Sequence, residues 1–202
     1  MSQPARSATE HLSELAEIAL QAAEALGPAI EQATTLVSET LSQGGTLFFC
    51  GNGGSAADAQ HIATEYTVRY LRRRMPLRAI ALTTDTSTLT ATANDFSFEE
   101  VFSRQVEALG RPGDLLIVHS TSGNSPNCIR ALQAAAARGM RSMALTAGDG
   151  GRVRLLADLT LVVPTSRTDR AQELHLAIQH AICDFIDASE QSAVDRRQGA
   201  TH

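Results

Sequence analysis

The sequence contains no tryptophan, and it has only two tyrosines and six phenylalanines among its 202 residues. Proteins that bind single-stranded nucleic acid stack the bases on aromatic side chains and follow the phosphates with a basic groove. Both features are missing, because the net charge is −5 and the one basic block is Arg72-Arg73-Arg74. We therefore expect no nucleic-acid partner, and we expect the arginine triplet to lie in a solvated loop.

Long apolar runs and paired cysteines are missing as well. No run approaches the roughly 20 residues that a membrane span requires, and the first residues, MSQPARSATEHLSEL, contain no apolar signal segment. Cys50, Cys128 and Cys183 form no CxxC pair. We expect a cytoplasmic protein with no membrane partner, whose three cysteines are buried thiols.

The hydrophobic pattern that is present changes its period near residue 45. Apolar residues recur at helical spacing over 12–26 and again over 30–41, and Gly27-Pro28 separates these two stretches. Because Gly and Pro usually end helices, the pattern predicts an αα-hairpin over residues 1–44. Its alanine-rich faces suit close packing in an oligomer.

Beyond residue 45, short apolar runs alternate with helix-like segments. The runs lie at 46–50, 78–82, 114–120, 143–146 and 159–164, and the segments at 55–71, 97–109, 126–138 and 169–188. The runs are apolar throughout, which is typical of strands covered on both faces. We predict an α/β domain over residues 45–187, with a five-stranded parallel sheet flanked by helices, and a disordered polar tail over 188–202.

Two loops at the ends of predicted strands contain small polar residues. Gly51-Asn52-Gly53-Gly54-Ser55 follows the first strand, and the loop from Ser120 to Ser125 follows the third and leads into Pro126. Ligands of open α/β sheets bind beyond the carboxyl ends of the strands. Glycines allow close approach of a ligand, Ser55 and Ser125 suit helix caps, and helix N-termini favour anions. These loops predict a site for a phosphate-bearing small molecule.

Two nucleotide-binding alternatives fit less well. The stretch from Gly51 to Ala56 satisfies the loose dinucleotide fingerprint GxGxxA, which also requires an acidic residue about 20 positions further on. The nearest candidate is Asp85, 34 residues after Gly51. No GK[ST] follows either loop, so a Walker motif is excluded. We therefore expect neither NAD nor a nucleoside triphosphate.

Candidate catalytic side chains follow on two of the predicted helices. His61 and Glu65 lie one helical turn apart, on the side opposite the apolar stripe, so they can share one ligand or form a solvated pair. On the last helix, Gln172 and His180 lie opposite the apolar face. They point either to solvent or to a cleft or neighbouring subunit. A carboxylate with an imidazole suits proton transfer near neutral pH.

Five segments of the sequence resemble the sugar isomerase (SIS) superfamily, and specifically the phosphoheptose isomerase family. They are CGNGGSAADAQHIATE, TANDFSFEEVFSRQVEALGRPGD, STSGNSPN, LTAGDGG and DRAQELHLAIQH, and they span roughly residues 28–187. The resemblance implies a Rossmann-like or flavodoxin-like SIS sandwich and a homotetramer with active sites at subunit interfaces. It also implies conversion of sedoheptulose 7-phosphate to D-glycero-D-manno-heptose 7-phosphate through an enediol, for heptose and surface-polysaccharide synthesis.

The resemblance also implies roles for individual residues. Glu65 would be the general base and His180 its acid/base partner. One zinc ion per subunit would be held by His61, Glu65, Gln172 and His180. Substrate contacts would come from Asn52, Gly53, Gly54, Ser55, Glu65, Asn94, Asp95, Ser120, Thr121, Ser122, Ser125 and Gln172. Because Gln172 and His180 are separated by about 12 Å of helical rise, a shared metal requires inward-reaching side chains, a distorted helix or ligands from different subunits.

Ala56 and Ala57 depart from the family pattern, since many members have two polar side chains there. The alanines resemble a SIS branch that binds a replication initiator and has no isomerase activity. A non-catalytic adaptor is therefore the alternative, although its members are expected to lack the Glu65 and His180 pair. A sugar-phosphate sensor, or an isomerase for another aldose, also remains open.

Three further residues have open or structural interpretations. Arg69 could reach a phosphate or pair with Glu65. His119 lies within an apolar run and is expected to be a hydrogen-bonded core residue. His175 lies between the apolar face of its helix and Gln172, so it could serve at an interface or support the site from behind.

Overall fold

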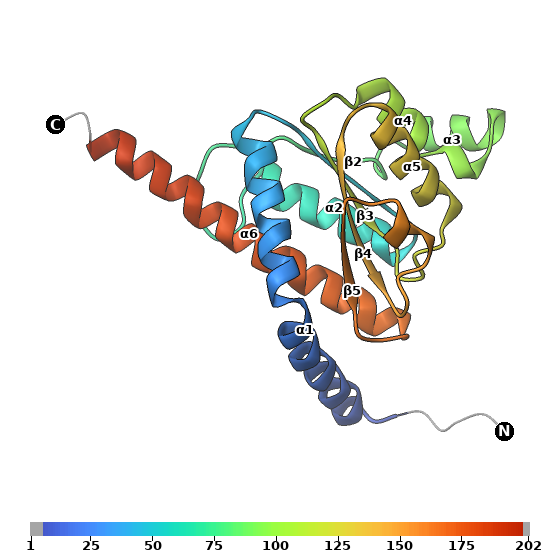
Figure 1. Ribbon diagram of the computed structural model, residues 1–202, viewed down its shortest axis with the longest axis horizontal. Helices are drawn as coiled ribbons and strands as arrows, with labels where there is room; N and C mark the ends of the chain where they lie inside the picture. Colours follow the sequence, from blue (N-terminus) through green and yellow to red (C-terminus); the bar gives the residue numbers. More distant parts are fainter. Residues whose placement is uncertain (1–5, 200–202) are drawn as a thin grey trace.

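Five parallel strands form one sheet in the computed structural model, which describes the backbone of residues 6–199 and the side chains of residues 6–190 (Figure 1). The strands are β1 (Leu47–Gly51), β2 (Ala79–Ala81), β3 (Leu115–His119), β4 (Arg141–Ala147) and β5 (Leu159–Val163). Their order across the sheet is β2-β1-β3-β4-β5, and every neighbouring pair is parallel. The predicted α/β class and sheet are confirmed.

Helices cover both faces of the sheet. One face packs against α1 (Ala8–Ser42), α2 (Gly54–Thr67) and α6 (Thr168–Gly199), and the other packs against α4 (Ser103–Leu109) and α5 (Pro126–Ala137) (Figure 1). Successive side chains of a strand point to opposite faces, so Phe48 and Phe49 enter different cores, and both are buried. The runs are apolar throughout for this reason. No described helix is both long and apolar enough to cross a membrane.

The prediction of an N-terminal hairpin is wrong. Residues Ala8–Ser42 form one helix of 35 residues that contains Pro28 and changes direction partway along its length (Figure 1). A proline inside a helix removes one backbone hydrogen bond and bends the axis, but it need not end the helix. Ala33 and Val37, after Pro28, are fully buried against the sheet, so packing continues the helix beyond the proline.

The predicted disordered tail is also wrong over most of its length. Helix α6 continues through residue 188 and ends at Gly199, whereas residues 200–202 lie outside the described part of the chain. The segment contains two residues each of Ala, Gln and Arg, which have high helix propensity, so it extends an existing helix without an apolar stripe.

The sequence missed one helix and merged two others. Helix α3 (Thr86–Asp95) is capped by Asp85, whose side chain accepts a hydrogen bond from the Thr88 backbone N–H. Its threonine-rich sequence lacks a helical stripe, and only Thr92 is buried. The single helix predicted at 97–109 is a 3₁₀ turn, η1 (Phe98–Glu100), followed by α4. A second 3₁₀ turn, η2 (Arg152–Leu155), precedes β5.

Two histidines are buried between the sheet and α6. His119 at the end of β3 is in hydrogen-bonding contact with Gln179, their nitrogens 3.1 Å apart, and the His175 Nε2 lies 3.1 Å from the Thr146 carbonyl oxygen. Both imidazoles are fully buried, as expected for His119, but their Nδ1 atoms have no partner among the described residues. Burial lowers the pKa of His119 to about 3 and that of His175 to about 4.

A buried ion pair joins the loop after α2 to the middle of α6. The Arg74 Nε donates to Asp187 Oδ1 at 2.6 Å, and both side chains are excluded from solvent, being 2% and 0% exposed. The other Asp187 oxygen accepts from the backbone N–H groups of Leu71 and Arg72, each at 2.8 Å. We call this arrangement the Arg74–Asp187 clamp. Arg74 is thus not solvated, contrary to the prediction for the arginine triplet.

Acidification is expected to destabilise the protein through the two buried histidines. An unfolded histidine has a pKa near 6.5, so between that value and its lowered folded pKa the unfolded chain binds more protons. Stability is therefore complete above about pH 6.5 and falls as the pH decreases. From pH 7 to pH 5 each histidine should remove about 2 kcal/mol of unfolding free energy, measured by urea denaturation. In His119→Leu this pH-dependent loss should shrink by about that amount; an unchanged pH dependence would contradict the assignment.

Breaking the clamp is expected to cost far more than breaking a surface pair. Arg74→Met leaves the buried Asp187 carboxylate unpaired, so the unfolding free energy should fall by about 3–5 kcal/mol. The matched control is Arg130→Met, because Arg130 pairs with Glu99 at 2.9 Å and both side chains are about half exposed. That variant should lose less than about 1 kcal/mol. Similar losses in both variants would show that the clamp has no special role.

Candidate active site

The first strand-end loop, the glycine loop after β1, leads into α2, the helix of His61 and Glu65. Gly53 has φ of +57°, a conformation that favours glycine, and α2 begins at Gly54. Ser55 therefore lies in the first turn, where it is buried, and makes no capping hydrogen bond, contrary to the sequence prediction. The buried stripe of Ala59, Ile62 and Tyr66 packs α2 onto the sheet and turns the opposite side of the helix toward α6.

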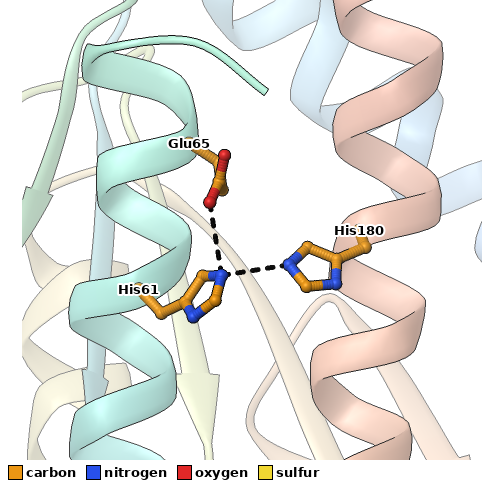
Figure 2. Close-up of side chains that lie close together, drawn as sticks. All are labelled: His61, Glu65 and His180. Carbon is orange, nitrogen blue, oxygen red and sulfur yellow. Dashed lines mark hydrogen bonds and ion pairs between the residues drawn. The ribbon is translucent and has the colours of Figure 1, made fainter. Parts of the chain in front are cut away.

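His61, Glu65 and His180 converge between α2 and α6. Figure 2 shows His61 and Glu65 on one helix pointing toward His180 on the other. The His61 Nε2 lies 3.2 Å from Glu65 Oε1 and 3.1 Å from His180 Nε2. The His61 side chain is 45% exposed and that of Glu65 is 20% exposed, so the cluster opens to solvent. The structure thus brings together residues that are 119 positions apart.

This cluster fits a metal ion. One ligand atom from each of the three residues lies within 4.8 Å of the other two. Zinc bonds histidine nitrogen at about 2.0–2.1 Å, so two ligands of a tetrahedral ion lie about 3.3 Å apart. The observed separations of 3.1 and 3.2 Å are close to that value. Two imidazoles and a carboxylate are also an ordinary donor set for zinc.

The ionisation of His180 is set by its surroundings. Partial burial lowers the pKa of His180, the neighbouring His61 lowers it further, and the negative charge of Glu65 opposes both effects. His180 is therefore neutral over more of the physiological pH range than an exposed histidine. A neutral imidazole can accept one proton while donating another, and it can also bind a metal.

An aromatic ring also stacks on His180. The Tyr70 and His180 rings are stacked, with centroids 5.2 Å apart and an angle of 14° between their planes. Tyr70 belongs to the irregular segment after α2, next to Leu71 and Arg72, whose backbone N–H groups bind Asp187. The contact therefore lies directly beside the Arg74–Asp187 clamp.

Gln172 lies against the glycine loop. A Cβ atom added at Gly54 would meet the Gln172 amide nitrogen at 2.6 Å, so only glycine allows this close approach. Gln172 of α6 thus faces the start of α2. His180, about two turns later on α6, faces His61, which lies about two turns later on α2. The structure brings Gln172 to the glycine loop and His180 to the histidine cluster.

The second strand-end loop leads into α5 as expected. Ser125 is the N-cap residue and Pro126 the first residue of the helix, although the Ser125 side chain makes no capping hydrogen bond. The Ser120 hydroxyl donates to the Ser125 hydroxyl at 3.3 Å. Asn52 in the glycine loop and Asn127 in the first turn of α5 form reciprocal amide hydrogen bonds of 2.9 and 2.8 Å. The glycine loop and the serine-rich loop therefore form one edge of the sheet.

A cavity of about 210 Å³ lies beside the serine-rich loop. It is lined by Thr121, Ser122, Ala147, Gly148, Asp149, Ser166, Arg167 and Thr168. None of these residues belongs to the histidine cluster. This cavity is therefore separate from the histidine cluster.

Some predicted site residues stay apart in this chain. Asn94 and Asp95 end α3 and are exposed, and the Asn94 amide donates to the Asp95 carboxylate at 2.8 Å. Within the described chain no hydrogen bond or ion pair joins either of them to the other predicted site residues. Arg69 donates to the Tyr70 carbonyl at 3.3 Å, and no ion pair with Glu65 is formed in the described structure.

Sequence reasoning missed four residues that support the site, Tyr70, Arg74, Asn127 and Asp187. Two weak signals were present: Asn127 follows the predicted helix start at Pro126, and Asp187 lies on the helix of His180, seven positions further on. Neither signal identifies a partner. Asp187 binds a segment more than one hundred residues away in the chain, which no local pattern indicates.

Comparisons with known proteins agree with this geometry. A family model for the SIS domain matches residues 10–147. The chain is 54% identical over 175 residues to the phosphoheptose isomerase of Aromatoleum aromaticum, covering 85% of this chain and 88% of the relative. For the phosphoheptose isomerase of Chlorobaculum parvum the identity is 57% over 157 residues, covering 76% and 75%.

A solved structure supports the same relationship. The phosphoheptose isomerase from Neisseria gonorrhoeae superposes with a TM-score of 0.85 at 48% identity, covering 89% of this chain and 96% of that one. The similarity in sequence and in fold therefore extends over most of both chains. The protein belongs to the SIS domain family and, within it, to the phosphoheptose isomerases.

Proposed function

We propose that the protein is an aldose–ketose isomerase that converts sedoheptulose 7-phosphate to D-glycero-D-manno-heptose 7-phosphate for heptose and surface-polysaccharide synthesis. The observation that carries the proposal is the convergence of Glu65 and His180 from α2 and α6. The relatives named phosphoheptose isomerase, at about half identical residues, supply the substrate class. The same pair argues against the non-catalytic adaptor, because an adaptor needs no proton-transfer residues.

Glu65 is the general base in this proposal. Isomerisation of a ketose removes a proton from C1, forms an enediol and returns a proton to C2, so one carboxylate can serve both transfers. Oxygen Oε1 of Glu65 faces His61, and no described residue forms a hydrogen bond or ion pair with Oε2. A carboxylate with one engaged oxygen and one free oxygen can hold its position and still accept a proton.

His180 moves the proton between the two oxygens. As the C2 carbonyl becomes a hydroxyl and the C1 hydroxyl becomes a carbonyl, one oxygen gains a proton and the other loses one. A neutral imidazole is suited to this shuttle, and burial lowers the pKa of His180 in that direction.

Zinc is the proposed cofactor, one ion per subunit, held by His61, Glu65 and His180. When bound, it would polarise the substrate carbonyl as a Lewis acid. Gln172 is the proposed fourth ligand, although in this chain its amide lies against Gly54. A ligand from another subunit would complete the set in its place.

The two strand-end loops are the proposed substrate-binding region. Asn52, Gly53, Gly54, Ser55 and Gln172 would contact the carbohydrate. Ser120, Thr121, Ser122 and Ser125 would hold the phosphate through their hydroxyls and the N-terminus of α5. Binding energy from the distal phosphate would orient the long flexible sugar over Glu65 and His180.

We also propose that the protein acts in the cytoplasm as a homotetramer. The three cysteines are free and buried, as suits a reducing compartment. The first half of α1 presents exposed Leu12 and Leu20, 67% and 74% accessible, which suit burial against another subunit. Asn94 and Asp95, apart from the site within one chain, would reach a neighbouring subunit's site.

Removing either acid/base group is expected to abolish isomerisation of sedoheptulose 7-phosphate. Glu65→Gln and His180→Gln preserve side-chain size but cannot exchange the required protons, so kcat should fall about 10²–10⁴-fold. The measurement is steady-state conversion with zinc-loaded enzyme. The control is Glu107→Gln, which changes an exposed glutamate on α4 and should leave kcat unchanged.

The outcomes separate the alternatives. A wild type that binds the sugar phosphate without converting it would replace the isomerase proposal with a sensor. A wild type that neither binds nor converts it would favour the adaptor, and an active His180→Gln variant would remove His180 from the mechanism.

Metal removal is expected to lower activity. A His61 variant distinguishes the loss of the metal from the loss of a proton-transfer residue. Dialysis against a chelator should inactivate the enzyme, and one equivalent of zinc per chain should restore it. His61→Ala should reduce bound zinc, measured by mass spectrometry, while Glu65 and His180 remain. Metal-free enzyme with full activity would show that the ion is not required.

A further inference from the structure

We propose that Tyr70 is a positioning residue for His180 and that the Arg74–Asp187 clamp holds Tyr70 in place. The inference rests on the proposed function, since it concerns the imidazole that transfers protons and could bind zinc. It starts from the stacked rings of Tyr70 and His180, 5.2 Å apart with an angle of 14° between their planes.

One hydrogen-bonding contact alone does not fix an imidazole. The Nε2 of His180 lies 3.1 Å from His61 Nε2, which determines the position of one atom of the ring. Rotation of a histidine ring about its outer side-chain bond is broad, so the ring plane needs a second constraint. The stacked, nearly parallel ring of Tyr70 supplies that constraint.

The segment that carries Tyr70 has no regular secondary structure and needs its own anchor. The backbone N–H groups of Leu71 and Arg72 both donate to Asp187 Oδ2 at 2.8 Å. Arg74 binds the other oxygen of Asp187 and donates to the carbonyl oxygens of Glu65 and Tyr66, at 2.7 and 2.8 Å. The loop is thus fastened to α6 and to the end of α2 together.

The anchor and the target lie on the same helix. Asp187 follows His180 by seven residues, which is about two turns of α6 and about 10 Å of rise. Because the helix holds Asp187 and His180 at a fixed separation, fastening residues 71–74 to Asp187 also fixes the place of Tyr70 relative to His180. The same arginine holds the end of the helix that carries Glu65. The clamp therefore sets both sides of the acid/base site.

The test compares Tyr70→Leu with Tyr70→Phe. Leucine removes the stacked ring, whereas phenylalanine keeps it and removes only the hydroxyl. Leu71→Ala is the matched control, because Leu71 is the next residue and its side chain is 61% exposed. Each folded variant is stripped of metal and titrated with Co²⁺, and its kcat and KM for sedoheptulose 7-phosphate are measured after zinc loading. Tyr70→Met replaces Tyr70→Leu if the leucine variant does not fold.

The expected result is a loss on the order of tenfold in Co²⁺ affinity and in kcat for Tyr70→Leu, as for other residues that orient a metal ligand. KM should stay unchanged, and Tyr70→Phe and Leu71→Ala should match the wild type. A Tyr70→Leu variant equal to the wild type in both measurements would overturn the inference. So would a Tyr70→Phe variant as impaired as Tyr70→Leu, because the hydroxyl rather than the stacked ring would then matter.

Failure of the proposed function gives a different result. If wild-type protein does not isomerise the sugar, the isomerase assignment falls. The Co²⁺ titration still reports whether Tyr70 orients His180, because it needs no substrate. An active wild type whose Co²⁺ affinity and kcat do not respond to Tyr70→Leu keeps the isomerase and removes the positioning role.

Discussion

The position of the active site depends on the Arg74–Asp187 clamp. Helices α2 and α6 come from opposite ends of the domain sequence, and each packs on the sheet through its own apolar stripe. Apolar packing tolerates small shifts, whereas hydrogen bonds to a buried carboxylate do not. Asp187 accepts three such bonds, and Arg74 also binds the carbonyl of Glu65. The ion pair thus fixes two separately packed helices relative to each other, and with them the proposed acid/base residues Glu65 and His180.

The site divides its tasks between two regions. The edge of the sheet supplies backbone amides, hydroxyls and a helix N-terminus, and the reciprocal Asn52 and Asn127 hydrogen bonds hold the glycine loop against the start of α5. The space between α2 and α6 supplies groups that change protonation state. Gln172, lying against Gly54, connects the two regions along one helix. In the proposed function, this separation of anion binding from proton transfer keeps the phosphate charge away from Glu65.

The sequence predicted the features that depend on local pattern. Strands covered on both faces are mostly apolar and form continuous hydrophobic runs, so all five were found. The spacing of His61 and Glu65 is a property of one helix. The course of α1 through Pro28 was not predictable, because packing against the sheet outweighs the local tendency to stop. The burial of Arg74 was hidden within a charged triplet, since its partner is 113 residues away. The pairing of His180 with His61 came from family resemblance, because contacts between distant helices leave no periodic trace.

Helix α6 also limits how the gene can change. Gln172, His180 and Asp187 lie on one continuous helix, and each faces a different fixed partner: the glycine loop, His61 and Arg74. Inserting one residue rotates every later residue of the helix by about 100° around the helix axis and shifts it by about 1.5 Å along that axis. An insertion between Gln172 and Asp187 would therefore separate at least one of these contacts from the others. The first twenty residues of α6, from Thr168 to Asp187, must therefore keep their register for all three contacts to persist.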